Sequence, residues 1–474
     1  MPLNRVTRPR PRIGVFGIGL EAYWPQFAGL KERLEGYQGE VERRLQGFGV
    51  ELVSAGMVDT PEKARQAGAL FSRQEVDLIV CYVATYATSA QVLPAVQRRG
   101  APVLVLNLQP VAALDYPTVD TGEWLANCCA CCVPELSCAF ARAGIEFNVV
   151  SGQLFEDARA WGQIQQWCQA AGVFRTLGQA RVGFLGHTYP GMLDMYSDFT
   201  AHHAQLGLHV EVLEMCDLKA RVDQVGEKEL QAKVAQIREI FALVPVVDEG
   251  ALHWSAQVAA GLDRLVADFG LDGLAYYYRG LAGNEYEALG AGLIAGNSLL
   301  TGRGIPCAGE GDLKTCVAML VLDCLEAGGS YTEFYAMDFT DNFLLMGHDG
   351  PGHLALSDQQ PLLRKLPLYH GKRGAGLSVE FKVRTGPVTI LGLTQTRQGA
   401  LKFVAAQGQS LPGPIMQIGN TNSRLQYALD PATFMDQWCA QGPTHHVALG
   451  IGHQLDKLAK VSRLLNLELA VVSR

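Results

Sequence analysis

The feature that most constrains the fold is a repeated alternation of short apolar runs with longer, charged and periodic segments. The segment at 25–48 is predicted to be a helix because its apolar residues recur at helical spacing. A further helix is expected to begin at Pro61, since Thr60 supplies an N-cap and Glu62 a first-turn acid. Strands that alternate with helices predict a parallel sheet with helices on both faces. The predicted strands of this first part are 12–17, 49–53, 76–83 and 102–107.

The same alternation starts again near residue 180, and a different pattern follows from about Tyr331. In the last part, short strand-like runs follow one another closely, which predicts an antiparallel sheet or barrel. In parallel sheets, ligands bind at the carboxyl ends of the strands, so the loops there are the ones to inspect. Predicted elements of the second part are strands 180–186, 208–213 and 270–278 and helices 227–243, 288–300 and 312–326; the chain is expected to end with helix 454–465 and strand 467–472.

Charge and composition exclude several classes of protein. The chain has 474 residues and a net charge of −8, and no dense Lys/Arg run follows residue 12, which argues against nucleic acid as a partner. The run 13–16 reads as a strand and not as the core of a signal peptide, and no apolar run is long enough to span a membrane. Most of the 12 cysteines are scattered singly, as buried thiols in a cytoplasmic protein are. We therefore expect a cytoplasmic protein with reduced thiols.

Four separate segments carry side chains of the kind that bind metal ions. Glu310 stands between two glycines just before a predicted helix, and Asp338 lies on a strand entering a turn. His348 is on the returning strand, and His446 follows His445 at the start of a late strand. Two carboxylates and two imidazoles from different elements suit an octahedral divalent ion such as Mn²⁺, with positions left open for substrate oxygens.

Each of these residues also has a structural interpretation. Glu310 could be a first-turn helix acid, and Asp338 or its neighbour Asp341 could cap a hairpin turn. Single histidines such as His348 are more often structural than metal-binding, and His353 is an alternative to it in the same loop. Spacing alone leaves these alternatives open.

The order of these motifs resembles that of the L-arabinose isomerase / L-fucose isomerase superfamily, and the L-arabinose isomerase branch more closely. The most specific piece is Gly309–Thr315, GEGDLKT, which is similar to the family's GEGDWKT segment with its first metal-binding glutamate. The segments Val80–Tyr86 and Asn127–Glu135 resemble the family's N-terminal loops. The further matching motifs are Met337-Asp338, Met346-Gly347-His348 and Thr444-His445-His446-Val447.

The resemblance implies a fold and a reaction. The fold would comprise two flavodoxin-like parallel-sheet α/β domains, 1–175 and 176–328, and an antiparallel, barrel-like β-rich domain, 329–474. The reaction would be aldose–ketose isomerisation, an intramolecular oxidoreduction through a metal-bound cis-enediol(ate), on a pentose, deoxyhexose or related sugar. The ion would be Mn²⁺ or another divalent cation such as Co²⁺ or Mg²⁺. A homo-oligomer, a trimer or hexamer, would be expected, with each pocket completed by a neighbouring subunit.

The resemblance also implies roles for individual residues. Glu310 and Asp338 would be the acid–base pair as well as metal ligands, with His348 and His446 completing the coordination. Packing is the alternative role for every candidate substrate contact. These candidates are Leu20, Glu21, Tyr86, Cys131, Met192, Tyr278 and His445.

The chain departs from the family at substrate-recognition positions. Gly17–Glu21 lacks the glutamine that arabinose enzymes carry there, and Cys131 stands where they have a pocket histidine. Within NCCACCVPELSC, adjacent cysteine side chains diverge and are poorly placed for one tetrahedral metal, so we expect space-filling thiols at the start of a pocket-lining helix. The sugar is therefore left open, and two other functions stay in view: a sugar-binding or regulatory protein, and an epimerase on the same scaffold.

Overall fold

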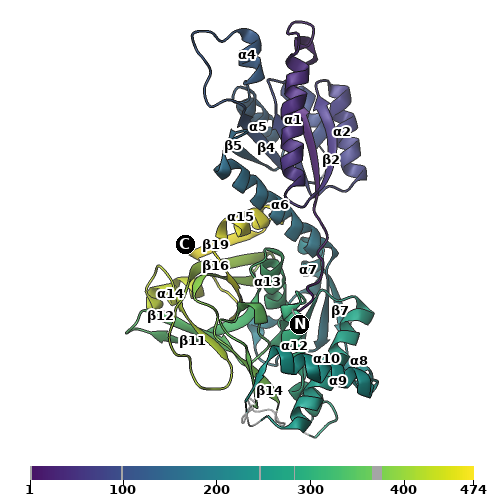
Figure 1. Cartoon of the computed structure of the whole chain (residues 1–474), viewed down its shortest axis with the longest axis vertical. Helices are drawn as coiled ribbons and strands as arrows, with labels where there is room; N and C mark the ends of the chain where they lie inside the picture. Colours follow the sequence, from purple (N-terminus) through teal and green to yellow (C-terminus); the bar gives the residue numbers. More distant parts are fainter. Residues whose placement is uncertain (1–2, 98–99, 245–246, 282, 366–375) are drawn as a thin grey trace. The chain divides into compact units, whose positions relative to one another are not determined.

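A computed structural model describes residues 3–97, 100–244, 247–281, 283–365 and 376–474 of the chain. The chain divides into two compact units (Figure 1). The smaller unit spans Pro9–Arg175, and the larger unit comprises Thr176–Arg474 together with the N-terminal residues before Pro9. Each unit is described by itself below.

The smaller unit is a parallel sheet with the strand order β2-β1-β3-β4-β5. β2 lies on one side of β1 and β3 on the other, so the direction of the strand order changes between β1 and β3. The carboxyl ends of these two strands form the switch point where such sheets bind ligands. All six residues of β3 are buried, as in a strand covered on both faces. The strands are β1 Arg12–Ile18, β2 Glu51–Val58, β3 Leu78–Val83, β4 Val103–Gln109 and β5 Phe147–Gln153.

Two helices of the smaller unit were predicted from the sequence. α2 starts at Pro61 as predicted, and the side chain of Thr60 accepts a hydrogen bond from the backbone N–H of Lys63 (3.3 Å). The predicted helix at 25–48 is shorter than expected and begins at Leu30. The helices are α1 Leu30–Gln46, α2 Pro61–Arg73, α3 Ser89–Val96, α4 Thr121–Ala126, α5 Cys132–Arg142 and α6 Ala158–Gln179, which runs on into the larger unit.

The cysteine-rich stretch leads into α5. Cys129 and Cys132 belong to the hydrophobic core between the sheet and its helices, whereas Cys131 is exposed at the N-cap position of α5. Glu135 accepts hydrogen bonds from the N–H of Ser89 (2.8 Å) and the hydroxyl of Tyr86 (3.1 Å), so it ties α5 to the start of α3. All twelve cysteines are free thiols.

The larger unit begins with a second parallel sheet, ordered β10-β9-β6-β7. The predicted helix at 288–300 is two helices, because the chain turns at Gly292 between them. A 21-residue helix, α10, was not predicted; Asp248 caps its start and Gly270 its end. The elements are β6 Arg181–Gly186, β7 His209–Leu213, β9 Gly273–Tyr277, β10 Cys307–Ala308, α7 Phe199–Leu206, α8 Met215–Asp223, α9 Glu227–Ile240, α10 Glu249–Phe269, α11 Glu287–Ala291, α12 Leu293–Gly302 and α13 Leu313–Cys324.

The last part of the larger unit is a β-rich structure in which six strands close a ring, through the pairings β15-β18-β11-β12-β17-β16 and β16 back to β15. Every pairing within the ring is antiparallel, which confirms the predicted barrel-like sheet. A seventh strand, β19, runs parallel to β16 on the outside of the ring order. The elements are β11 Ser330–Asp338, β12 Phe343–His348, β15 Gly386–Gln395, β16 Leu401–Ser410, β17 Thr421–Gln426, α14 Pro431–Ala440, β18 His446–Ile451, α15 Leu455–Leu464 and β19 Glu468–Ser473.

A small sheet joins the two parts of the larger unit. Its order is β14-β13-β8, with strands Leu377–Glu380, Leu362–Lys365 and Ala242–Leu243. β8 belongs to the α/β part and pairs in parallel with β13 of the β-rich part. The boundary expected at 328/329 stays a prediction.

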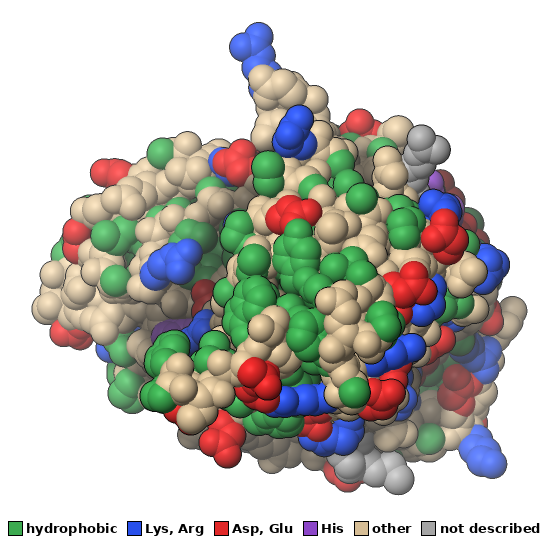
Figure 2. Space-filling model, turned by 90° about the horizontal axis from the view of Figure 1, so that it is seen from above, with side chains coloured by type: hydrophobic (Ala, Val, Ile, Leu, Met, Phe, Trp, Pro, Cys, Tyr) green, Lys and Arg blue, Asp and Glu red, His purple; other side chains and the backbone are tan. Residues whose placement is uncertain are grey.

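Surface features bear on two excluded classes. In the described part of the chain, no helix combines the length and apolar character that crossing a bilayer requires. On the face shown in Figure 2, blue and red side chains are interspersed, and the described side chains there form no continuous basic patch of the kind that binds nucleic acid.

Buried His202 predicts how stability depends on pH. Burial lowers its pKa to about 4, and the charge of Lys314 adds to the effect. The unfolded chain, with a histidine pKa near 6.5, therefore binds more protons between pH 6.5 and pH 4. We expect the free energy of unfolding to fall by up to about 3 kcal/mol as the pH drops across this window. Urea unfolding of wild type and His202→Gln at pH 7 and pH 4.5 checks this: the variant should lose that component, and equal pH dependence in both would contradict it.

Candidate metal centre

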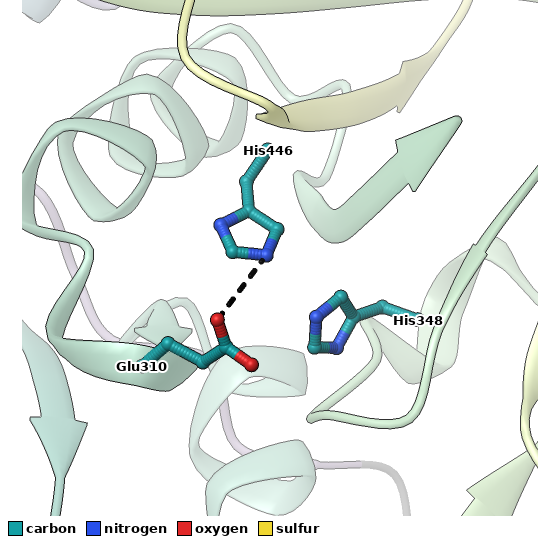
Figure 3. A group of neighbouring side chains, drawn as sticks. All are labelled: Glu310, His348 and His446. Carbon is teal, nitrogen blue, oxygen red and sulfur yellow. Dashed lines mark ion pairs between the residues drawn. The ribbon is translucent and has the colours of Figure 1, made fainter. Parts of the chain in front are cut away.

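Three side chains from distant parts of the larger unit converge on one point. Glu310, His348 and His446 each offer a ligand atom, and these atoms lie within 4.8 Å of one another. Glu310 is in the single turn η3 (Gly309–Gly311), His348 ends β12, and His446 begins β18. Figure 3 shows the carboxylate and the two rings pointing toward one another.

Glu310 is held in an unusual backbone conformation. Its φ of 58° and ψ of 12° lie in the left-handed region, which residues other than glycine rarely adopt. The turn is pressed against the loop that follows β6: the Glu310 carbonyl accepts from the N–H of Tyr189 (2.9 Å). A Cβ at Gly311 would lie 2.5 Å from the carbonyl oxygen of His187, so only glycine fits there. The glycines of GEGD therefore allow the close approach that aims the carboxylate.

A second carboxylate, Glu333, stands beside these residues and was missed by the sequence analysis. Glu333 is directly opposite His446 in the antiparallel pairing of β11 with β18. Cross-strand pairs of this kind place their side chains on the same face, about 5 Å apart at Cβ. Glu333, His445 and His446 accordingly form a second group of ligand atoms within 4.8 Å. Burial raises the pKa of Glu333; His446 and His445 oppose this, and Glu310 and Asp349 add to it.

The structure does not bring Asp338 to this group. Asp338 lies at the far end of β11, roughly 17 Å from Glu333 at the usual rise of an antiparallel strand. Its carboxylate accepts from the backbone N–H groups of Thr340 (2.9 Å) and Asp341 (2.8 Å), so it caps the β11–β12 turn. Asp341 is exposed and lies 3.9 Å from Arg424. The turn-capping interpretation thus fits the structure, with Asp338 as the residue that caps.

His446 is fixed through its Nδ1. That nitrogen lies 3.1 Å from a carboxylate oxygen of Asp312 and 2.7 Å from the hydroxyl of Tyr331, which itself donates to the Gly309 carbonyl (3.2 Å). Asp312 also caps α13 by accepting from the N–H of Thr315 (3.0 Å). A carboxylate behind a histidine in this way sets the tautomer and leaves Nε2 for a metal ion.

The charges of this pair support each other. Burial alone would raise the pKa of Asp312, but the hydrogen bond and charge of His446 hold it below its usual value. Burial alone would lower the pKa of His446, but Asp312, and then Glu310 and Glu333, raise it. The negative charges around His446 thus favour a cation at this point.

His348 and His353 occupy different environments. The N–H of Gly350 donates to Nδ1 of His348 (2.9 Å), while Nε2 lies 3.9 Å from the Glu333 carboxylate. His353 is buried with its Nε2 3.5 Å from Asp323. Of the two histidines, His348 is therefore the one that joins the group of ligand atoms.

The donor set fits a divalent cation. Nε2 of His446 is buried and has no hydrogen-bond partner among the described residues, and it lies 3.8 Å from a carboxylate oxygen of Glu310. That distance is too long for a hydrogen bond. It suits two ligands of one ion, since atoms about 2.1 Å from an octahedral ion lie roughly 3 to 4 Å apart. Mixed carboxylate and imidazole donors match Mn²⁺, Co²⁺ or Mg²⁺ better than a soft metal.

Comparison with known proteins places these residues in a family. A sequence model of the L-arabinose isomerase central domain matches residues 197–328, and one of the L-fucose isomerase C-terminal domain matches 352–473. The L-arabinose isomerase of Acidothermus cellulolyticus is 24% identical over 408 residues, covering 83% of this chain and 80% of that protein. The enzyme of Pectobacterium carotovorum is 23% identical over 441 residues, covering 89% and 86%.

The chain is a distant member of the L-arabinose isomerase / L-fucose isomerase superfamily. Among solved structures, a periplasmic solute-binding protein from Actinobacillus succinogenes with bound D-allose is 13% identical and covers 56% of this chain and 78% of that one. Its TM-score of 0.18 is too low to bear on fold or function.

The candidate substrate contacts of this superfamily member fall in both units. In the larger unit, Met192 precedes the turn η2 (Leu193–Met195), and Tyr278 follows β9 and donates to Asn284 (3.0 Å). His445 precedes His446, and its Nδ1 lies 2.6 Å from a carboxylate oxygen of Asp194. In the smaller unit, the candidates follow β1, follow β3 or lie at the start of α5; they are Leu20, Glu21, Tyr86 and Cys131.

Sequence analysis also missed an aromatic cluster beside Glu310. The rings of Tyr189 and Tyr277 are 4.8 Å apart, and those of His187 and Tyr277 are 5.2 Å apart. Burial raises the pKa of Tyr277 to about 12, with Glu310 among the further causes. The signal for these residues was their place at the carboxyl ends of two parallel strands: Tyr277 ends β9, and His187 and Tyr189 follow β6.

The Asp312 contact predicts a loss of metal affinity. Removing a carboxylate that orients a ligating histidine weakens metal binding by roughly 10- to 100-fold. We expect Asp312→Ala to weaken Mn²⁺ binding by that factor, measured by electron paramagnetic resonance titration of the purified chain. Asp338→Asn is the comparison, because that carboxylate caps a turn away from the group. Equal Mn²⁺ affinity in Asp312→Ala and wild type would show that Asp312 does not orient a ligand.

Proposed function

We propose that this protein is a metal-dependent aldose–ketose isomerase. The observation that carries the proposal is the convergence of Glu310, Glu333, His348 and His446 at one edge of the β-rich ring. The similarity to L-arabinose isomerases over most of both chains supports it. The substrate would be a pentose, a deoxyhexose or a related sugar in its open-chain form.

These four side chains would hold Mn²⁺, or Co²⁺ or Mg²⁺ in its place. When bound, such an ion supplies a Lewis acid that polarises a sugar carbonyl and stabilises negative charge on neighbouring oxygens. Glu310 keeps its expected place, and Glu333 takes the place of the second acid expected at Asp338. The ligand set is thus two carboxylates and two imidazoles, as proposed from the sequence, with one member changed.

Proton transfer between C1 and C2 is assigned to the carboxylates. A base removes the C2 proton of the aldose, the electron pair forms the C1–C2 double bond of a cis-enediol, and the same group returns the proton to C1. Glu333 suits this task because its carboxylate stands directly across from His446, among the side chains that would hold the ion. Glu310 would then serve the transfer between the hydroxyl groups. The reaction is balanced and needs no external oxidant or reductant.

The assembly and compartment complete the proposal. We propose a trimer or hexamer in which a neighbouring subunit completes each pocket, with Leu20, Glu21, Tyr86 and Cys131 acting on the neighbour's substrate. Sedimentation of the purified chain tests this, and a monomer would contradict it.

The cytoplasm is proposed because all twelve cysteines are free thiols.

An epimerase is the second candidate, because a buried base beside a metal site can equally remove a proton next to a carbonyl and return it to the same carbon. Isomerisation moves the proton to the neighbouring carbon, whereas epimerisation does not. A panel of aldoses and ketoses incubated with the Mn²⁺-loaded protein in D₂O separates the two by the products and by the carbon that carries deuterium. Sugar binding without turnover would favour a binding protein instead.

Variants of the three acids distinguish their roles. We expect Glu310→Gln and Glu333→Gln each to lower kcat by roughly 100-fold or more, the usual cost of losing an acid–base group. Asp338→Asn should stay within about twofold of wild type, since the asparagine Oδ1 still accepts from the N–H groups of Thr340 and Asp341. Dialysis against EDTA should abolish turnover, and Mn²⁺ should restore it. Full activity in Glu333→Gln together with loss in Asp338→Asn would return the second-acid role to Asp338.

A further inference from the structure

A carboxylate in the α/β part of the larger unit, Asp194, contacts the residue that precedes the proposed ligand His446. Asp194 lies in η2, in the loop between β6 and α7, and one of its carboxylate oxygens accepts from the backbone N–H of His445 (3.0 Å). The same oxygen lies 2.6 Å from Nδ1 of the His445 ring. One carboxylate therefore fixes both the backbone and the side chain of the residue next to His446.

This contact decides which nitrogen of His445 is free for a ligand. An ionised carboxylate only accepts hydrogen bonds, so Nδ1 of His445 carries the proton. In the neutral ring Nε2 is then an acceptor. A ring nitrogen of His445 lies within 4.8 Å of ligand atoms of Glu333 and His446. Because Nδ1 is hydrogen-bonded to Asp194, Nε2 is the ring nitrogen left to accept a hydrogen bond from a ligand.

His445 and His446 differ sharply in their access to solvent. The His446 side chain is 1% exposed, whereas His445 is 36% exposed and Asp194 is 35% exposed. His446 thus faces inward, toward Glu310, while His445 stands where an incoming molecule can reach it. This difference suits a substrate contact for His445 better than a place in the inner ligand set.

The loop that carries Asp194 is itself anchored. The ammonium group of buried Lys314 donates to the backbone carbonyl of Tyr196 (2.7 Å). The Ser197 hydroxyl lies 2.6 Å from Nε2 of His202, and Asp198 caps the start of α7. The anchored residues lie two to four positions after Asp194, so the surrounding fold restrains the loop that carries it.

We propose that Asp194 is a positioning residue: it holds the His445 ring next to His446 and keeps Nε2 free to accept a hydrogen bond from a substrate hydroxyl. The inference rests on the proposed function for its substrate, but not for the pairing of Asp194 with His445. It assigns His445 to the sugar and excludes it from the metal ligands.

Kinetics and metal binding test the assignment together. We expect Asp194→Ala and His445→Asn each to lower kcat/KM by roughly 10- to 100-fold, the usual effect of losing a residue that orients a functional histidine. The double variant should be no worse than His445→Asn, because residues that act as a unit are not additive. The dissociation constant for Mn²⁺ should change by less than about threefold. Asp341→Asn, an exposed acid on the β11–β12 turn, is the matched control.

A second measurement does not depend on turnover. In the Mg²⁺-loaded, ¹⁵N-histidine-labelled protein, the His445 ring is assigned by its absence in His445→Asn. Nitrogen chemical shifts should report the Nδ1–H tautomer in wild type and its loss in Asp194→Ala. Asp194→Asn, of the same size but without the charge, should lie between wild type and Asp194→Ala in kcat/KM.

Three results would overturn the inference. The first is an unchanged His445 tautomer in Asp194→Ala, and the second is a loss of kcat/KM in the double variant that equals the product of the two single losses. The third is Mn²⁺ binding weakened tenfold or more in His445→Asn, which would make His445 a ligand. If the wild type isomerises no sugar, the proposed function fails, and the tautomer measurement alone decides whether Asp194 positions His445.

Discussion

The metal centre depends on the register of three neighbouring strands. β11 lies between β18 and β12, and both pairings are antiparallel. This register sets Glu333 opposite His446 and brings the end of β12, with His348, to the same edge of the ring. Because side chains alternate between faces, a shift of one residue in either pairing would turn one ligand away. The closed ring opposes such shifts, since every strand in it has two partners.

The fourth side chain reaches the same edge by a different means. Glu310 is supplied by the α/β part, in a turn whose backbone is strained at Glu310 and closely packed at Gly311. Strain of this kind persists only where surrounding contacts outweigh it. Here those contacts include the Tyr189–Glu310 hydrogen bond and the Asp312 cap of α13, whose carboxylate also fixes His446. Asp312 thus caps α13 and orients His446 with the same carboxylate.

The sequence was sufficient for features that local chemistry determines. Apolar runs and capping residues predicted the parallel sheets and the start of α2, and GEGD directed attention to Glu310. The second acid was different. Asp338 satisfied a local pattern, a methionine followed by an acid, whereas Glu333 is set by the pairing of strands more than a hundred residues apart, which a local pattern cannot reveal. The same limit applies to Asp194, whose partner His445 is 251 positions away. Helix α10 was a plainer omission, since Asp248 and Gly270 mark both its ends.

The short strand β8 has a consequence for exchanging parts between relatives. It lies within the α/β part but is hydrogen-bonded to the β-rich part. The N–H of Ala242 donates to the Pro361 carbonyl (2.9 Å), and the N–H of Val244 donates to the Leu363 carbonyl (3.2 Å). A hybrid enzyme joined at residue 328 would set one parent's β8 beside the other parent's β13. A working hybrid would therefore take β8 from the same parent as the β-rich part, or take the contacting side chains of β8 and β13 from one parent.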